Sequence, residues 1–158
     1  MRLVTYGVGG RERVGVQLDD GIHDAGFDGT MVELIAAGHE RLAAVERHAR
    51  SAPVVPDAVL RAPLRPRSLR DFLTFERHLR NVFSRLRREI SEEWYRVPAY
   101  YKGMPDTVIG PEEEIPWPAY SDHLDHELEL AAVIGAAGRD IPAERAMEHV
   151  FGWTIWND

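Results

Sequence analysis

The stretch that decides the fold is LDHELEL, residues 124–130, which leads directly into AAVIG at residues 131–135. Side chains of a β-strand alternate between its two faces. Asp125, Glu127 and Glu129 therefore share one face of the predicted strand, and leucines occupy the other. Same-face neighbours lie roughly 6.5–7 Å apart. Two carboxylates at that spacing repel each other unless they converge on a cation, together with a third ligand from another strand.

Two interpretations of this acidic face stay open. In the simpler one, the segment is a half-exposed antiparallel strand whose outer face happens to be acidic. In the other, the carboxylates form one wall of a metal site. Oxygen-only ligands suit hard divalent cations such as Mg2+, Mn2+ or Ca2+. The chain has no cysteine, which excludes both zinc–thiolate sites and disulfides.

Composition and charge limit the class of protein. The 158 residues correspond to one ordinary domain or to a modest domain with a smaller one. The formal charge of −7 argues against nucleic-acid binding, which needs a basic surface. A basic run at residues 77–88 is interpreted as the solvated face of a helix. No segment approaches the roughly 20 apolar residues of a membrane helix, and the first ten residues show no signal region. We therefore expect a cytoplasmic protein that binds neither membrane nor nucleic acid.

The pattern of elements predicts an α+β fold. Residues 2–8 and 13–26 read as short strands joined by Gly-rich turns, residues 31–38 and 39–50 as helices, and residues 58–64 as a short strand. Four prolines between residues 53 and 66 mark a linker. We therefore expect a small N-terminal β/α domain with its linker at residues 1–66, and a second domain at residues 67–158.

The second part mixes helices with short strands. Apolar residues at helical spacing predict a helix over residues 72–88, for which Asp71 is a candidate N-cap. Short β pieces follow at residues 98–103 and 106–118, and a longer strand at residues 127–135. Pro142 and Gly152 are the predicted start and stop of a further helix, and residues 153–158 are predicted as a core strand.

Three more blocks carry a resemblance to a known family. They are RDFLTFERHLRN at residues 70–81, PAYYKG at residues 98–103 and GWTIWND at residues 152–158. In order and spacing with LDHELELAAVIG, they resemble the fumarylacetoacetate hydrolase family from about Leu69 to Asp158. The resemblance implies the N-terminal portion of such an enzyme, truncated after the third metal-ligand Asp. It implies a small β/α unit followed by the first, incomplete part of a β-rich catalytic domain of the mixed β-roll type.

The resemblance also implies roles for individual residues. The family binds its divalent metal through an E-x-E strand, an Asp of a later ND or LD segment and, in the fumarylacetoacetases, an Asp of a DF pair. A His acts as general base on water, a task that suits the ordinary pKa of histidine. Substrate contacts come from a Tyr and an Arg in the fumarylacetoacetases, whereas the shorter members instead have a Lys after the aromatic residue. These roles fall on Glu127, Glu129, Asp158 and Asp71 for the metal, on His78 for the base, and on Tyr101, Lys102 and Arg87 for the substrate.

Two positions depart from the family pattern. Some members carry a Glu that orients the His three residues later, and Asn81 stands at that position here, as Asn does in the fumarylacetoacetases proper, which supply the Glu from a far C-terminal part. Fumarylacetoacetases carry a Tyr two residues after the DF aspartate, and Leu73 stands there. The second departure argues against fumarylacetoacetate itself as the substrate.

The implied activity is a divalent-metal-dependent hydrolysis of a carbon–carbon bond. The substrate class is a small 1,3-dicarbonyl or acylpyruvate-type oxo acid, as in the catabolism of aromatic compounds. The cofactor would be Mg2+ or Mn2+, with Ca2+ as a further fit, and the assembly a homodimer. Two alternatives stay open: a decarboxylase, isomerase or hydratase of 2-oxo acids in the same family, and a non-catalytic truncated fragment.

Overall fold

The computed structural model describes all residues, 1–158, and its elements belong to the α+β class, as predicted. Contacts divide the chain into two compact units. The first unit comprises residues 1–65 and 109–158, and the second comprises residues 66–108. This division rests on contacts, and the domain boundaries expected from the sequence stay a prediction. None of the helices has the length and apolar character needed to cross a membrane.

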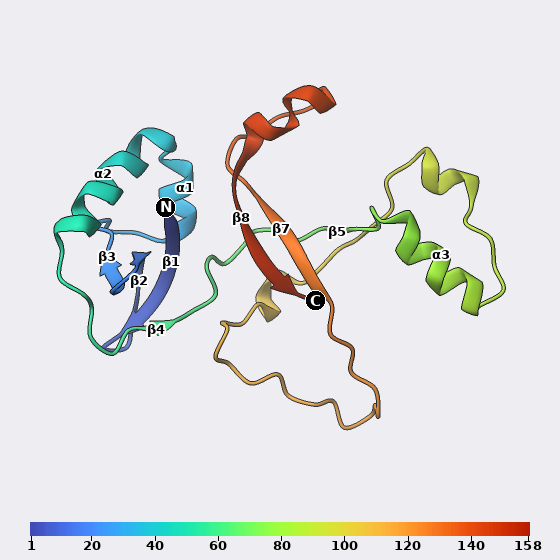
Figure 1. Ribbon diagram of the computed structural model, residues 1–158, viewed down its shortest axis with the longest axis horizontal. Coiled ribbons are helices and arrows are strands. Elements are labelled where there is room, and N and C mark those ends of the chain that lie inside the picture. The colour runs from blue at the N-terminus through green and yellow to red at the C-terminus, as the bar shows by residue number, and fades with distance from the viewer. The chain divides into compact units, whose positions relative to one another are not determined.

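An antiparallel sheet begins the first unit, in the strand order β3-β2-β1-β4 (Figure 1). Gly9 and Gly10 adopt positive φ angles of 56° and 77° in the two-residue turn between the first two strands. Glycine adopts this left-handed conformation without a steric penalty, and such turns match the twist of a hairpin. The strands are β1 at Arg2–Val8, β2 at Arg11–Leu18, β3 at Gly21–Asp24 and β4 at Val59–Leu60.

Two helices, α1 at Met31–Ala36 and α2 at His39–Ser51, bury the apolar face of this sheet. Thr30 starts α1 with a capping box: its hydroxyl accepts the Glu33 N–H, and the Glu33 carboxylate accepts the Thr30 N–H. The core consists of side chains from β2, from the loop after β3 and from both helices: Val14, Val16, Ala25, Met31, Leu34, Ile35, Val45 and Ala49.

A two-stranded hairpin, β7 at Leu128–Ile134 and β8 at Val150–Asn157, completes the first unit. One face of the hairpin is half-buried, and its Val133 and Phe151 pack against the core. The ring of Phe151 stacks on His39, with the ring centroids 5.5 Å apart. These contacts attach the hairpin to the helical layer of the unit. The other face exposes Leu128, Leu130, Trp153 and Ile155.

The second unit combines a short strand pair with one helix. Strand β5 at Asp71–Phe72 pairs antiparallel with β6 at Tyr100–Tyr101. Helix α3 spans Glu76–Arg85, and 3-10 turns occur at Glu92–Tyr95 and Pro105–Thr107. The Leu79 side chain of α3 is buried, whereas the arginines of residues 77–88 are exposed, as expected for a solvated basic face.

The start of α3 corrects one prediction. The helix begins at Glu76 after the N-cap Phe75, and not at residue 72. Asp71 and Phe72 instead pair with β6, and the Leu73 N–H extends this ladder by donating to Ala99 O at 3.2 Å. Phe72 and Phe75 continued the apolar periodicity upstream of the true helix, although both side chains are exposed. Asp71 is therefore a strand residue, and the helix N-cap interpretation was wrong.

The segment before β8 corrects a second prediction. Residues Ala143–His149 form a 3-10 helix, and Pro142 precedes it as the N-cap. Gly152 does not stop a helix, because it lies inside β8 opposite Val133. Strand β8 begins at Val150, so residues 150–152, which were predicted as the end of the helix, belong to the strand. The β piece expected over residues 106–118 was also wrong: Pro105–Thr107 form a 3-10 turn, and the rest of that segment contains no strand.

Candidate metal centre

Glu129 of β7 and Glu127, which precedes that strand, lie beside the end of β8 at the open end of the hairpin. Glu129 lies opposite Trp156 in the strand register. The Asp158 N–H donates to Glu127 O at 2.9 Å, which continues the ladder beyond the assigned strands. Asp158 therefore stands across from Glu127 and diagonal to Glu129. Alternation and register together place all three on one face of the hairpin.

Two of these carboxylates come close together. One carboxylate oxygen of Glu129 and one of Asp158 lie within 4.8 Å of each other. Glu129 is half-buried on the inner face of β7, and Asp158 is exposed. Glu127 contributes its backbone carbonyl to the pairing, and its exposed carboxylate is not part of this close group. The donor set is oxygen-only and anionic, which fits Mg2+, Mn2+ or Ca2+ and not a soft metal.

The second unit carries the remaining predicted site residues. Asp71 of β5 is half-buried and lies directly opposite Tyr101 of β6. Directly opposed side chains in an antiparallel pair project to the same face about 5 Å apart. Lys102 follows Tyr101 immediately and is exposed. The strand pair thus brings a predicted metal ligand beside one predicted substrate contact, Tyr101.

His78 lies in the first turn of α3. Its backbone N–H donates to Phe75 O at 3.0 Å, and its side chain is exposed. Asn81 follows three residues later, on the same helical face. The imidazole is therefore open to water, as a base that deprotonates water requires.

Arg87 occupies an unusual backbone position. Its φ angle is +52°, in the left-handed region. The Arg88 N–H donates to Phe83 O at 2.9 Å and the Arg87 N–H to Ser84 O at 3.2 Å, so the helix ends in a Schellman-type cap. Glycine is the usual residue at such a position because it lacks Cβ. An arginine there carries backbone strain, which sequence inspection had not revealed.

Sequence inspection also missed a polar cluster around Glu76. The Tyr95 hydroxyl donates to Glu76 Oε1 at 2.8 Å, and Arg80 donates to the same oxygen. Hydrogen bonds from Tyr95 and Arg80 lower the pKa of Glu76. The i,i+4 spacing of Glu76 and Arg80 could have indicated their pairing. Nothing in the sequence pointed to Tyr95, which lies 19 residues away.

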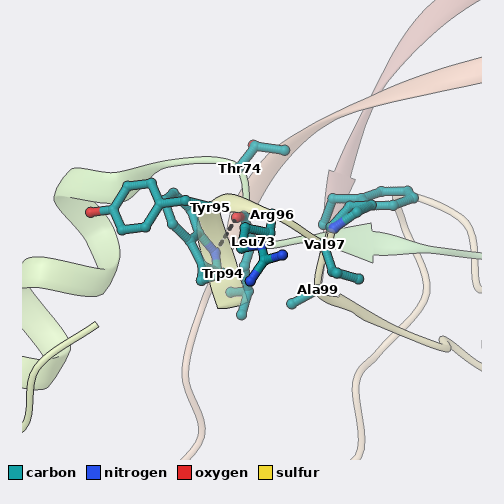
Figure 2. A pocket seen from close by; sticks show the side chains of 9 residues that line it. Leu73, Thr74, Trp94, Tyr95, Arg96, Val97 and Ala99 are labelled. Atoms are coloured by element: carbon teal, nitrogen blue, oxygen red, sulfur yellow. Dashed lines mark hydrogen bonds between the residues drawn. The ribbon is translucent and has the colours of Figure 1, made fainter. Parts of the chain in front are cut away.

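A pocket of about 320 Å³ lies next to this cluster, between residues 72–74 and residues 94–99 (Figure 2). Figure 2 shows the Trp94 indole held by a hydrogen bond from Nε1–H to Leu73 O, at 3.0 Å. The hydroxyl of Tyr95 extends away from the pocket. None of the lining residues was predicted as a site residue, although Leu73 had been noted as a departure from the family pattern.

Comparisons with known proteins show which family the chain resembles. Residues 68–158 match the family model described as "Fumarylacetoacetate (FAA) hydrolase C-terminal". The bovine mitochondrial oxaloacetate tautomerase FAHD2A is 32% identical over 134 residues, which cover 82% of this chain and 40% of the bovine protein. Its human counterpart is 39% identical over 61 residues, which cover 39% of this chain and 19% of the human one.

A solved structure shows the same similarity in three dimensions. The fumarylacetoacetate hydrolase of the psychrophile Exiguobacterium antarcticum superposes with a TM-score of 0.74 at 28% identity. The superposition covers all of this chain and 55% of that enzyme, so the chain spans about half the length of this relative. The matched family region contains every residue predicted to bind metal or substrate. The chain belongs to the fumarylacetoacetate hydrolase family.

Proposed function

We propose that the chain carries the metal-binding part of an enzyme that acts on small oxo acids through an enolate. The reaction proposed first is hydrolysis of a carbon–carbon bond in an acylpyruvate-type substrate. The observation that carries the proposal is the approach of Glu129 and Asp158, whose carboxylate oxygens lie within 4.8 Å across the β7–β8 pair. Family membership supports a shared enolate chemistry more strongly than it supports one reaction.

The proposed metal ligands are the residues predicted from the sequence. Glu129 and Asp158 form the close pair, Glu127 stands across from Asp158, and Asp71 is the fourth proposed carboxylate. Oxygen-only ligands favour Mg2+ or Mn2+, and Ca2+ fits the same donors. A bound divalent cation supplies Lewis acidity that stabilises negative charge on the enolate oxygen.

The proposed roles of the other residues follow from their chemistry. His78 accepts a proton from water, whose oxygen forms a bond to the acyl carbonyl carbon. The carbon–carbon bond then breaks, and the pyruvate enolate takes up the proton as it becomes pyruvate. Lys102 and Arg87 provide cationic groups for a substrate carboxylate, and Tyr101 provides a hydroxyl donor.

A second reaction has its own support. The bovine and human relatives are described as oxaloacetate tautomerases, and the bovine match extends over 82% of this chain. Tautomerisation needs the same stabilised enolate and a proton carrier, but no attacking water. Leu73, which departs from the fumarylacetoacetase pattern, is compatible with such a substrate. A homodimer and a cytoplasmic location remain part of the proposal.

Turnover assays with two substrates test the proposal. The natural polypeptide that carries these 158 residues is given acetylpyruvate or the enol form of oxaloacetate, with Mg2+, with Mn2+ or with a chelator. We expect metal-dependent release of acetate and pyruvate from acetylpyruvate. Rapid ketonisation of oxaloacetate without cleavage would favour the tautomerase. Absence of turnover with both substrates in the presence of metal would sink the enzymatic proposal and favour a non-catalytic fragment.

The role of His78 needs its own comparison. Replacement of a general base lowers kcat/KM by about 10²–10⁴-fold, so we expect the kcat/KM of His78→Ala to fall by a factor in that range. His123→Ala is the matched control, since His123 is equally exposed and has no proposed role. An equal loss in both variants, or no loss in His78→Ala, would contradict the assignment.

A further inference from the structure

The pocket of the second unit lies between two segments that are held by hydrogen bonds. Its base is the ladder between β5 and β6, extended by the Leu73 N–H to Ala99 O bond at 3.2 Å. One wall is the half-buried Trp94 indole, whose Nε1–H donates to Leu73 O. The segment after Trp94 is a turn in which the N–H groups of Arg96 and Val97 both donate to Glu93 O, at 3.0 and 2.9 Å. These hydrogen bonds hold the backbone of both segments that border the pocket, and the side chains of those segments line it.

The lining is largely apolar and open to solvent. Phe72 is 45% exposed, Leu73 41% and Val97 59%, although these side chains surround a concave site of about 320 Å³. An apolar cavity of about 150 Å³ binds benzene, so this pocket has room for a ring and a short chain. Exposed apolar surface that lines a concavity is typical of a ligand site.

Both walls are continuous with predicted active-site residues. Residues 72–74 directly follow the proposed metal ligand Asp71, and residues 94–99 run into β6, where Tyr101 precedes Lys102. The chain turns sharply at Leu73, where the Thr74 N–H donates to Phe72 O at 2.8 Å. A substrate held by Tyr101 and Lys102 at its oxo-acid end would lie close to this pocket along the same short strand pair.

We propose that this pocket binds the apolar end of the oxo-acid substrate, an aryl group or a comparably large alkyl group, and thereby selects substrates by that substituent. The inference rests on the proposed function for the identity of the polar end. It assigns Trp94, Leu73 and Val97 as specificity-determining residues. The single charged side chain of the lining, Arg96, is exposed and lies 3.6 Å from Glu93, so its charge is partly balanced.

Calorimetric titration with phenylpyruvate and pyruvate tests the pocket directly. The two probes share the oxo-acid end, so the ratio of their dissociation constants reports the aryl group alone. We expect phenylpyruvate to bind the natural polypeptide about tenfold more tightly or better. Val97→Asp should reduce the ratio to about one, because it places a charge beside the ring. Leu73→Ala should reduce it about fivefold, through lost apolar contact.

Met104→Asp is the matched control, because Met104 is 63% exposed in the same unit and lies outside the pocket. It should leave the ratio unchanged. Repeating the titrations in the presence of a chelator distinguishes a failure of the proposed pocket from a failure of the proposed metal chemistry. If the metal chemistry fails, both probes lose affinity but their ratio persists. A ratio near one in the unmodified protein, or an unchanged ratio in both pocket variants, would overturn the inference.

Discussion

At the scale of single residues, Arg87 combines a predicted substrate contact with a strained backbone. A non-glycine residue in the left-handed region costs roughly 1–2 kcal/mol. Such strain persists only where the surrounding structure enforces it, and it gathers at functional sites. The cap at the end of α3 thus retains an arginine where glycine would fit better.

We therefore predict that Arg87→Gly separates stability from activity. Glycine relieves the left-handed strain but adds freedom to the unfolded chain, so the free energy of unfolding should rise by about 0.5–1 kcal/mol. Loss of the guanidinium should raise KM for an oxo acid about tenfold or more. Urea denaturation and steady-state kinetics measure the two effects.

Asp57→Gly provides the control for this prediction, because Asp57 also has a left-handed φ, of 55°, and has no predicted role at the site. It should stabilise the fold to a similar extent and leave KM unchanged. If Arg87→Gly left KM unchanged as well, Arg87 would be a helix cap and not a substrate contact.

The sequence predicted some residues of the site for sound physical reasons and missed others. Period-two alternation is short-range, so it correctly assigned Glu129 to one face and Leu128 and Leu130 to the other. The closeness of Asp158 to Glu129 followed from the family resemblance, since pairing across 29 positions has no local signature. The bond from Trp94 to Leu73 O has none either, and the pocket was missed for that reason.

At the scale of elements, α1 depends on its N-cap. It has only six residues, and isolated helices of that length are unstable in water. We predict that Thr30→Ala lowers the free energy of unfolding by about 0.5–2 kcal/mol, because it leaves the Glu33 N–H without its acceptor. Chemical denaturation measures the loss.

Thr30→Ser keeps the hydroxyl and should cost only a few tenths of a kcal/mol. Equal losses in the two variants would mean that the methyl group of Thr30, and not the capping box, stabilises this helix.

The wrong helix boundary in the second unit also belongs to this scale. Phe72 and Phe75 extended the apolar periodicity of α3 by a full turn, yet Phe72 pairs with Tyr100. A two-residue strand pair leaves no periodic pattern, and its partner lies nearly 30 positions away. Long-range pairing overrode local propensity, as it commonly does at element ends.

At the scale of the whole molecule, stability should depend on pH through His23. This side chain is only 5% exposed, and its ring nitrogens lie 2.8 Å from Asp20 Oδ1 and 2.8 Å from Ala52 O. Two acceptors favour the doubly protonated ring, so the hydrogen bonds to Asp20 and Ala52 raise the pKa of His23. Its contribution to stability is fully present below the ordinary pKa of about 6.5 and is lost as pH rises through the folded value.

We predict that the melting temperature falls between about pH 6 and pH 8, and that His23→Gln flattens this dependence. Thermal scans by circular dichroism across that range measure it. The carboxylate of Asp20 has the opposite pH dependence. Hydrogen bonding to His23 lowers the pKa of Asp20, so the contribution of Asp20 to stability is lost as pH falls through its pKa in the folded protein. A slope in His23→Gln equal to that of the unmodified protein would contradict the assignment.

Residues 1–65 of the first unit were the most predictable part of the molecule. Their strands, turns and helices follow one another with short connections, and local signals such as the Gly9–Gly10 turn mark them. The hairpin was harder, because alternation gives its two faces but not what each face contacts. Trp153 and Ile155 were predicted as core residues, yet they are 52% and 72% exposed.

A calorimetric Mn2+ titration of the natural polypeptide and of Glu129→Gln tests the proposed metal centre directly. The glutamine keeps the size of the side chain but removes the charge that is proposed to bind one cation together with Asp158. We predict one site per chain in the unmodified protein and an affinity at least about tenfold lower in the variant. Glu112 is exposed and has no proposed role, so Glu112→Gln should bind Mn2+ as the unmodified protein does. Equal Mn2+ affinity in all three proteins would contradict a metal centre at Glu129 and Asp158.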